Sequence, residues 1–286
     1  MVKFRAWYLL LPAVLLLAFV DLAPFFYELY LSFTRWIFTV PKPPTYIGLE
    51  NYKFLVNDSA FLGSLTLGTL FAFTGVIIQL LIGLATAFII HRRFRGVGVF
   101  KVILTLPLAI APVAVGSMWR LMMYPGIGPI PYYMERLLGI DWDITANSDA
   151  AFATTIIMDT WHWLPLVALI LLAGIEKVPL DILESAEVDG VGNWQKLMHI
   201  FLPLIKYEVA LVVLLRAMDA FRIFDEIWML TGGGPGSATR YLSLLLYTLI
   251  LRGWDIGYGA TVSIIFLYII IVVSWILYQI IARVSE

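Results

Sequence analysis

Long runs of apolar residues, separated by short polar stretches, follow one another along most of the chain. Six of these runs are long enough for a helix that crosses a bilayer, which needs roughly 20 residues. A membrane β-barrel would show alternating segments of about 10 residues instead, and these runs are continuously apolar. The pattern predicts an all-α integral membrane protein with six transmembrane helices. The predicted spans are about 7–32, 62–90, 99–123, 151–174, 205–229 and 259–282.

The composition agrees with this class. Of the 286 residues, 61% are hydrophobic and 14% are charged, which no ordinary soluble domain of this size matches. The net charge of −1 does not suggest nucleic acid as a partner. The absence of cysteine excludes disulfides and thiol chemistry, and three scattered histidines do not form a metal site.

The first apolar run follows Lys3 and Arg5, so a cleaved signal peptide is an alternative to a first transmembrane helix. The run is longer than the apolar part of a signal peptide, and no small-x-small cleavage site precedes Asp21. We therefore expect an N-terminal part at 1–61, with one helix and an outer loop. A core of five helices follows at 62–286.

The orientation follows from lysine and arginine in the loops, which favour the cytoplasm. The compact run from His91 to Arg95, which includes Arg93, lies in a very short loop between two spans. Placing this loop in the cytoplasm puts both chain termini there. The same orientation places the charged loop at 175–205 in the cytoplasm. We expect a multi-pass protein of the cell membrane.

The charged loop at 175–205 has helical features of its own. Pro179 suits the first turn of a helix, and Gly190 and Gly192 can end it. A second short helix is predicted over 194–201, before Pro203. Without further information, an amphipathic loop lying on the membrane surface would explain the pattern equally well.

The spacing within this loop resembles the cytoplasmic "EAA" loop of ABC importer permeases, E-[AS]-A-x-x-x-G followed by I-x-L-P. The resemblance implies a type I (MetI-like) permease fold, in which a coupling helix plugs into a separate ATPase. Ser185 departs from the usual alanine. The residues that the resemblance assigns to ATPase coupling are Glu184, Ser185, Ala186, Asp189, Gly190, Ile200, Leu202 and Pro203.

A second segment, from Phe224 to Thr239, resembles the "LTGGGPxxxT" segment of carbohydrate-type ABC permeases, specifically the first, maltose-F-like subunit. The resemblance implies three partners: a second, maltose-G-like permease subunit, an ABC ATPase dimer and an extracytoplasmic sugar-binding protein. The glycines lack the lysine of a phosphate-binding loop. ATP and Mg²⁺ are therefore expected on the partner ATPase, and no cofactor on this chain.

Ionisable residues inside predicted spans are costly and are functional candidates by default. Carboxylates that accept hydrogen bonds from hydroxyls, beside aromatic rings, suit sugar binding. Such pairs can also hold helices together, and Gln79 is interpreted as a helix–helix contact. Arg222 is expected to be neutralised by acidic neighbours one helical turn away. The candidate substrate contacts are Asp159, His162, Trp163, Arg216, Asp219, Ala220, Ile223 and Phe224.

These features predict a permease subunit, without enzyme activity of its own, that imports a sugar or polyol by alternating access. The same machinery could instead import glycerol-3-phosphate, for which arginines without acidic partners would be favoured. A membrane-embedded enzyme that uses Asp159, His162 and Asp219 is a more distant alternative. No nucleophile–base pair in the sequence supports such an enzyme.

Overall fold

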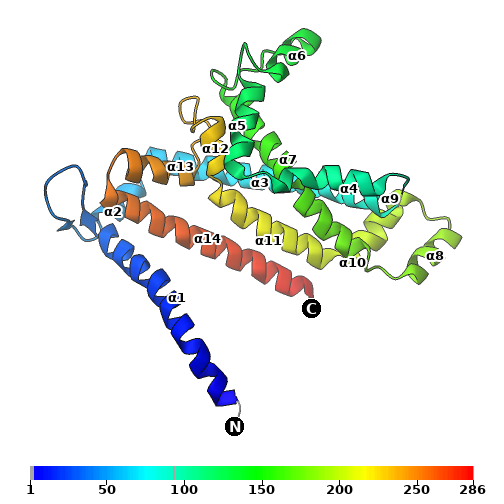
Figure 1. Ribbon diagram of the computed structural model, residues 1–286, viewed down its shortest axis with the longest axis horizontal. Coiled ribbons are helices and arrows are strands. Elements are labelled where there is room, and N and C mark those ends of the chain that lie inside the picture. The colour runs from blue at the N-terminus through cyan, green and yellow to red at the C-terminus, as the bar shows by residue number, and fades with distance from the viewer. Residues whose placement is uncertain (1–2, 93, 286) are drawn as a thin grey trace. The chain divides into compact units, whose positions relative to one another are not determined.

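The computed structural model describes residues 3–92 and 94–285, with the side chains of residues 10–92 and 94–282. Arg93, part of the basic run behind the predicted orientation, lies outside the described residues, as do Met1 and Val2. The described chain is mostly helical (Figure 1). Its longer helices are α1 (Lys3–Ser32), α3 (Ser59–His91), α4 (Val97–Thr105), α5 (Pro112–Met123), α6 (Pro129–Leu138), α7 (Ser148–Ile175), α8 (Leu180–Val188), α11 (Lys206–Arg222) and α14 (Ile256–Ser285).

Short elements connect these helices. They include a two-stranded antiparallel hairpin of β1 (Thr34–Arg35) and β2 (Thr45–Tyr46). The short helices are α2 (Glu50–Leu55), η1 (Leu106–Ala109), α9 (Asn193–Lys196), η2 (Leu197–Phe201), α10 (Leu202–Leu204), α12 (Asp225–Leu230), α13 (Leu242–Tyr247) and η3 (Thr248–Arg252).

Four of the predicted spans are single helices that are long and apolar enough to cross a membrane. They are Leu10–Ser32, Ser59–His91, Ser148–Ile175 and Ile256–Ala282. Two further helix pairs pass the same test together but are bent, by 101° after Ala109 and by 73° after Leu204. The described chain therefore has four spans, or up to six if each bent pair counts as one. The protein is a multi-pass membrane protein with several apolar helices.

The predicted span at 99–123 is broken at Ile110 and Ala111, whose backbone is extended. Pro112 explains the break, because a proline disfavours helical backbone in the residue before it and then suits the first turn of the next helix. The apolar run continues through this point, so hydropathy alone did not reveal it.

The predicted span at 205–229 also differs from the structure. Helix α11 ends at Arg222, Ile223 and Phe224 leave helical geometry, and α12 begins at Asp225. Neither glycine nor proline marks this break. Helix α12 instead packs on α5, where Gly116 lies so close to the backbone of Glu226 that a side chain would not fit. We attribute the break to this tertiary packing.

Two compact units divide the described chain, and each has its own contacts. One contains residues 3–62 and 245–269. Within it, the Tyr258 hydroxyl donates to Asp58 Oδ2 at 2.6 Å, and the Thr261 hydroxyl donates to the Ser32 carbonyl at 2.9 Å. The predicted division of the chain at residue 61 stays a prediction.

The other unit contains residues 63–244 and 270–285, with two buried apolar clusters. The first includes Phe71, Met158 and Ala220, and the second includes Ala87 and Val167. Helices α3, α7 and α11 contribute to both clusters. The segment of each helix between the clusters carries the polar residues of the candidate site.

Candidate functional site

Three buried polar side chains form a closed hydrogen-bonded cluster between the two apolar clusters. Arg216 of α11 donates from Nη2 to both carboxylate oxygens of Asp159 on α7, at 3.0 and 2.9 Å. Arg216 Nε donates to Gln79 Oε1 of α3 at 2.8 Å, and Gln79 Nε2 donates to Asp159 Oδ2 at 2.7 Å. This Gln79–Asp159–Arg216 cluster ties α3, α7 and α11 together. It confirms that Gln79 makes a helix–helix contact.

The charges of this cluster are buried, so they need hydrogen-bond partners within the protein. Each of the three residues is at most 2% exposed, so water contributes little to the solvation of the two charges. A buried ion pair is tolerated only when its geometry is good and its remaining polar atoms have partners. Arg216 meets this condition with a further bond from Nη1 to Asp219 Oδ2 at 3.3 Å. Its guanidinium also lies 4.9 Å from the ring centroid of Trp163. Asp159 and Arg216 therefore have little capacity left for a solute, and their geometry suits holding the walls of a site.

A cavity of about 200 Å³ lies beside this cluster. Six of the eight predicted substrate contacts line it. Four further residues, from α5, α11 and α12, complete the wall. The lining residues are Pro112, Asp159, Trp163, Arg216, Asp219, Arg222, Ile223, Phe224, Asp225 and Glu226.

The side chains that remain available in this cavity combine carboxylates with aromatic rings. The Asp219 side chain is 49% exposed, in contrast to its buried partner Arg216. Trp163 is partly buried, and Phe224 stacks on Trp228 with ring planes 7° apart. Carboxylate oxygens accept hydrogen bonds from hydroxyl groups, and aromatic side chains offer large rigid apolar surfaces. This arrangement can bind a polyhydroxylated molecule.

The cavity is acidic overall, because four carboxylates and two arginines line it. Arg222 makes no ion pair with any residue that the structure describes. The prediction that its acidic neighbours in a continuous helix neutralise it is wrong, since α11 ends at Arg222. Arg222 and Asp225 are both exposed at the cavity.

Two predicted substrate contacts do not line the cavity. His162 is buried on α7, where its Nδ1 lies 3.2 Å from Glu226 Oε1, so it connects α7 to α12. Ala220 packs inside the first apolar cluster. Conversely, Pro112 was not predicted, since it belongs to a different helix and nothing in its local sequence relates it to the site.

The predicted coupling residues lie on and after α8. The helix begins after Pro179, and Gly190 ends it with a φ of 72°, as the sequence predicted. Glu184, Ser185 and Asp189 are exposed, whereas Ala186 is only 6% exposed. Ile200 of η2 and Leu202 of α10 are partly buried, and Pro203 of α10 is exposed.

Several large apolar side chains of this loop are exposed. Val188 is 88% exposed, Leu180 70% and Trp194 69%. Exposed apolar side chains grouped on a charged loop are typical of a contact surface.

The glycine-rich segment after α12 is an organised loop. The hydroxyls of Thr231 and Thr239 lie 2.6 Å apart, and Thr239 Oγ1 donates to the Gly234 carbonyl at 3.0 Å. Gly232 and Gly233 have φ values of 62° and 96°, a backbone that side chains disfavour. The glycines therefore serve to close this loop.

Comparisons with known proteins agree with these observations. The family model described as "binding-protein-dependent transport system inner membrane component" matches residues 79–286. The trehalose transport system permease protein SugA of Mycobacterium tuberculosis is 32% identical over 271 residues, covering 95% of this chain and 86% of that protein. The trehalose/maltose transport system permease protein MalF of Thermococcus litoralis is 32% identical over 260 residues, covering 90% and 86%.

A crystal structure of a bacterial alginate ABC transporter, in complex with an alginate-bound periplasmic protein, contains a chain of the same fold. The TM-score is 0.85 at 18% identity, with 99% of this chain and 96% of that chain covered. The family model covers more than half of the chain, and the two relatives are named permease proteins. The chain belongs to the family of binding-protein-dependent transport system inner membrane components.

Proposed function

We propose that this chain is one transmembrane subunit of an ATP-driven importer for a neutral sugar or polyol. The cavity beside the Gln79–Asp159–Arg216 cluster carries this proposal, because it combines the Asp219 carboxylate with the Trp163 and Phe224 rings. The names of the relatives that transport trehalose, maltose or starch degradation products support the same solute class.

The proposed topology has six spans: four single helices, one span from the bent pair that includes α5, and one from α11, with the short helices before α11 left in the loop. Both termini and the 175–205 loop then lie in the cytoplasm. In this topology α8 is the coupling helix, and the exposed Leu180, Val188 and Trp194 side chains would contact the ATPase. ATP and Mg²⁺ are bound by that partner, and this chain holds no cofactor.

The family works with an ATPase, a binding protein and a second permease subunit. We propose that the second subunit is of the maltose-G-like type. A loaded binding protein docks on the outer side, and closure of the ATPase dimer moves α8. The coupling loops pass this motion to the spans, and the cavity opens alternately to the two sides.

A reconstituted complex tests this function. The chain would be purified with its co-encoded subunits in proteoliposomes, and ATP hydrolysis and uptake measured with the binding protein and a panel of neutral sugars, polyols and glycerol-3-phosphate. We expect one neutral sugar or polyol to stimulate hydrolysis and to accumulate inside. If no solute does so and no ATPase co-purifies, the proposal is wrong.

Glycerol-3-phosphate is a second candidate because Arg222 is exposed at the cavity and makes no ion pair with a described residue. A phosphate would interact favourably with this guanidinium. The four lining carboxylates oppose an anion, so we favour a neutral solute. Under the phosphate alternative Arg222→Gln abolishes uptake, whereas under the sugar proposal Asp219→Asn has the larger effect.

A further inference from the structure

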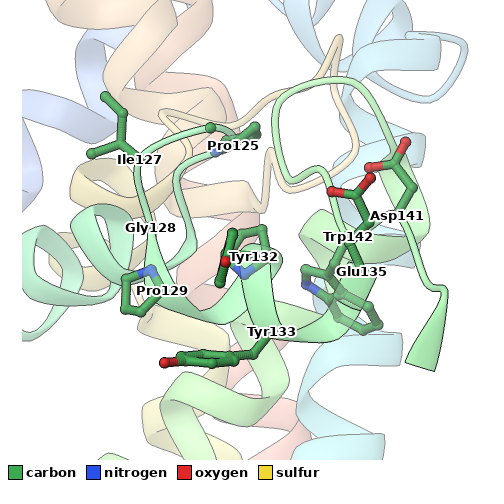
Figure 2. A pocket seen from close by; sticks show the side chains of 11 residues that line it. Pro125, Ile127, Gly128, Pro129, Tyr132, Tyr133, Glu135, Asp141 and Trp142 are labelled. Carbon is green, nitrogen blue, oxygen red and sulfur yellow. The ribbon is translucent and has the colours of Figure 1, made fainter. Parts of the chain in front are cut away.

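A second cavity, of about 360 Å³, is lined by residues of the loop after α5, of α6 and of the loop before α7 (Figure 2). Tyr132, Tyr133 and Trp142 contribute aromatic rings to its wall, and Glu135 and Asp141 contribute carboxylates. Figure 2 shows the two tyrosines near the centre of the view and the two acidic residues with Trp142 to one side. Within the described part of the chain, no lysine or arginine lines this cavity. We call it the outer cavity.

The wall of the outer cavity is fixed by hydrogen bonds outside it. Trp142 Nε1 donates to Thr154 Oγ1 on α7 at 2.9 Å, which holds the edge of the indole ring in place. Asp143 accepts from the Thr145 backbone N–H at 2.6 Å and from the Thr145 hydroxyl at 2.6 Å. Gly128 packs against the backbone of Met122 with no room for a side chain. A wall held in this way loses little conformational entropy on binding a ligand.

The position of the outer cavity along the chain places it on one side of the membrane. It precedes α7, whereas the 175–205 loop follows α7, and a 28-residue helix spans about 42 Å at 1.5 Å per residue. The two lie at opposite ends of one spanning helix. With the loop in the cytoplasm, as proposed above, the outer cavity faces outside.

Helix α5 connects the outer cavity to the inner one. Pro112, at the start of α5, lines the cavity beside the Gln79–Asp159–Arg216 cluster. Pro125, two residues after its end, lines the outer cavity. The 12 residues of α5 span about 18 Å. The two cavities therefore lie near the two ends of one short helix.

We propose that the outer cavity binds a neutral sugar outside the membrane, before the sugar reaches the inner cavity. Both carboxylates accept hydrogen bonds from sugar hydroxyls, and the exposed Tyr133 ring packs on a C–H face. The volume of about 360 Å³ suits a monosaccharide or disaccharide and falls within the usual range of small-molecule sites. The Arg136 guanidinium lies 5.1 Å from the centroid of the Tyr132 ring, but Arg136 does not line the cavity. The two lining carboxylates disfavour an anionic sugar. The inference rests on the proposed function for the side of the membrane and for the solute class.

Saturation-transfer difference NMR on the full chain in lipid nanodiscs tests this site. The probes are trehalose, maltose, glucose and glycerol, with glucuronate as an acidic and glucosamine as a cationic comparison. All variants carry Asp219→Asn, which weakens the inner cavity. In this background we compare Glu135→Gln/Asp141→Asn and Tyr133→Ala with Leu137→Ala, an exposed α6 residue outside the cavity.

We expect the transfer to at least one neutral probe to fall at least threefold in both cavity variants and to persist in Leu137→Ala. Equal saturation transfer in all variants, or no saturation transfer to any neutral probe, overturns the proposal. Transfer to glucosamine alone assigns the cavity to cations and also overturns it. Sugar uptake into proteoliposomes distinguishes failure of the outer-site proposal from failure of the proposed import function. If sugar is taken up and binding is unaltered in the cavity variants, the outer-site proposal alone is refuted. If no solute is taken up, the proposed function is refuted.

Discussion

Replacing Arg216 by methionine removes every charge-neutralising partner of Asp159 while keeping a long side chain in the space between α7 and α11. Arg216 donates two bonds to Asp159, one to Gln79 and one to Asp219, and three of these four bonds end on buried acceptors. After the change, only the Gln79 amide donates to Asp159. Leaving one member of a buried pair without its partner costs about 3–5 kcal/mol. We expect a loss of this size in the free energy of unfolding.

The companion change Asp159→Asn leaves Arg216 charged and buried, so we expect a similar loss. The double variant Asp159→Asn/Arg216→Met contains neither charge, and an asparagine oxygen can still accept from Gln79. Its cost is then that of the remaining unmade hydrogen bonds, about 1–3 kcal/mol. The double variant should therefore be at least about 2 kcal/mol more stable than the sum of the two single effects predicts.

Equilibrium unfolding in mixed detergent micelles measures these values, with the fluorescence of the ten tryptophans as the signal. Arg222→Met is the matched control, because Arg222 is exposed and makes no ion pair with a described residue. We expect it to cost less than about 1 kcal/mol. A cost below about 1 kcal/mol for Arg216→Met, or simple additivity in the double variant, would refute the assignment of the cluster as a closed structural unit.

Four further predictions concern separate parts of the chain. Asp219→Asn should raise the KM for sugar uptake about 10-fold, the effect of losing one charged hydrogen bond of about 1.5 kcal/mol, with unchanged assembly by gel filtration; loss of assembly instead would make Asp219 structural. Gly190→Asp, at a φ of 72°, and Glu184→Arg should uncouple ATP hydrolysis from uptake while the protein reaches the membrane, and normal uptake in both would contradict the coupling role of α8. Gly116→Val should displace α12 from α5 and lower the melting temperature of the purified chain by several degrees, whereas an unchanged melting temperature would show that this packing is dispensable. The hydrogen bond from the Thr145 hydroxyl, and then those from backbone N–H groups, lower the pKa of Asp143. The Asp143 carboxylate therefore stabilises the loop above about pH 4, and this stabilisation is lost as the pH falls through the lowered pKa. Protection of the Thr145 amide from hydrogen exchange should fall in that range, and it should be low at every pH in Asp143→Ala.

The long single helices could be predicted from the sequence because their signal is local. Four spans follow from continuous apolar runs, and the end of α8 follows from Gly190, whose backbone geometry favours glycine. The break before Pro112 also has a local cause, but the apolar run on both sides conceals it. The break at Ile223 and Phe224 has no local cause, since it depends on the packing of α12 against Gly116.

The candidate site was predictable as a set of residue types and not as a geometry. Asp159 and Arg216 were both predicted as substrate contacts, because an ionisable residue in a span is unusual. Their mutual pairing joins residues that are 57 positions apart in the sequence. The spacing of residues along a single helix cannot predict a contact between two helices. The pairing leaves Asp219 as the accessible carboxylate next to it. Arg222, predicted to be neutralised within a continuous helix, is exposed at the cavity because α11 ends at this residue.

The two non-helical residues between α11 and α12 have a consequence for how motion travels through this unit. Helix α12 is held by α5 through the close approach at Gly116 and by α7 through the contact between His162 and Glu226. Helix α11 has no continuous backbone ladder into α12, so a rotation that arrives along α11 is absorbed by the torsion angles of Ile223 and Phe224. The junction acts as a hinge beside the inner cavity. The cavity residues of α11 can change their angle to α12 while those of α12 stay in place.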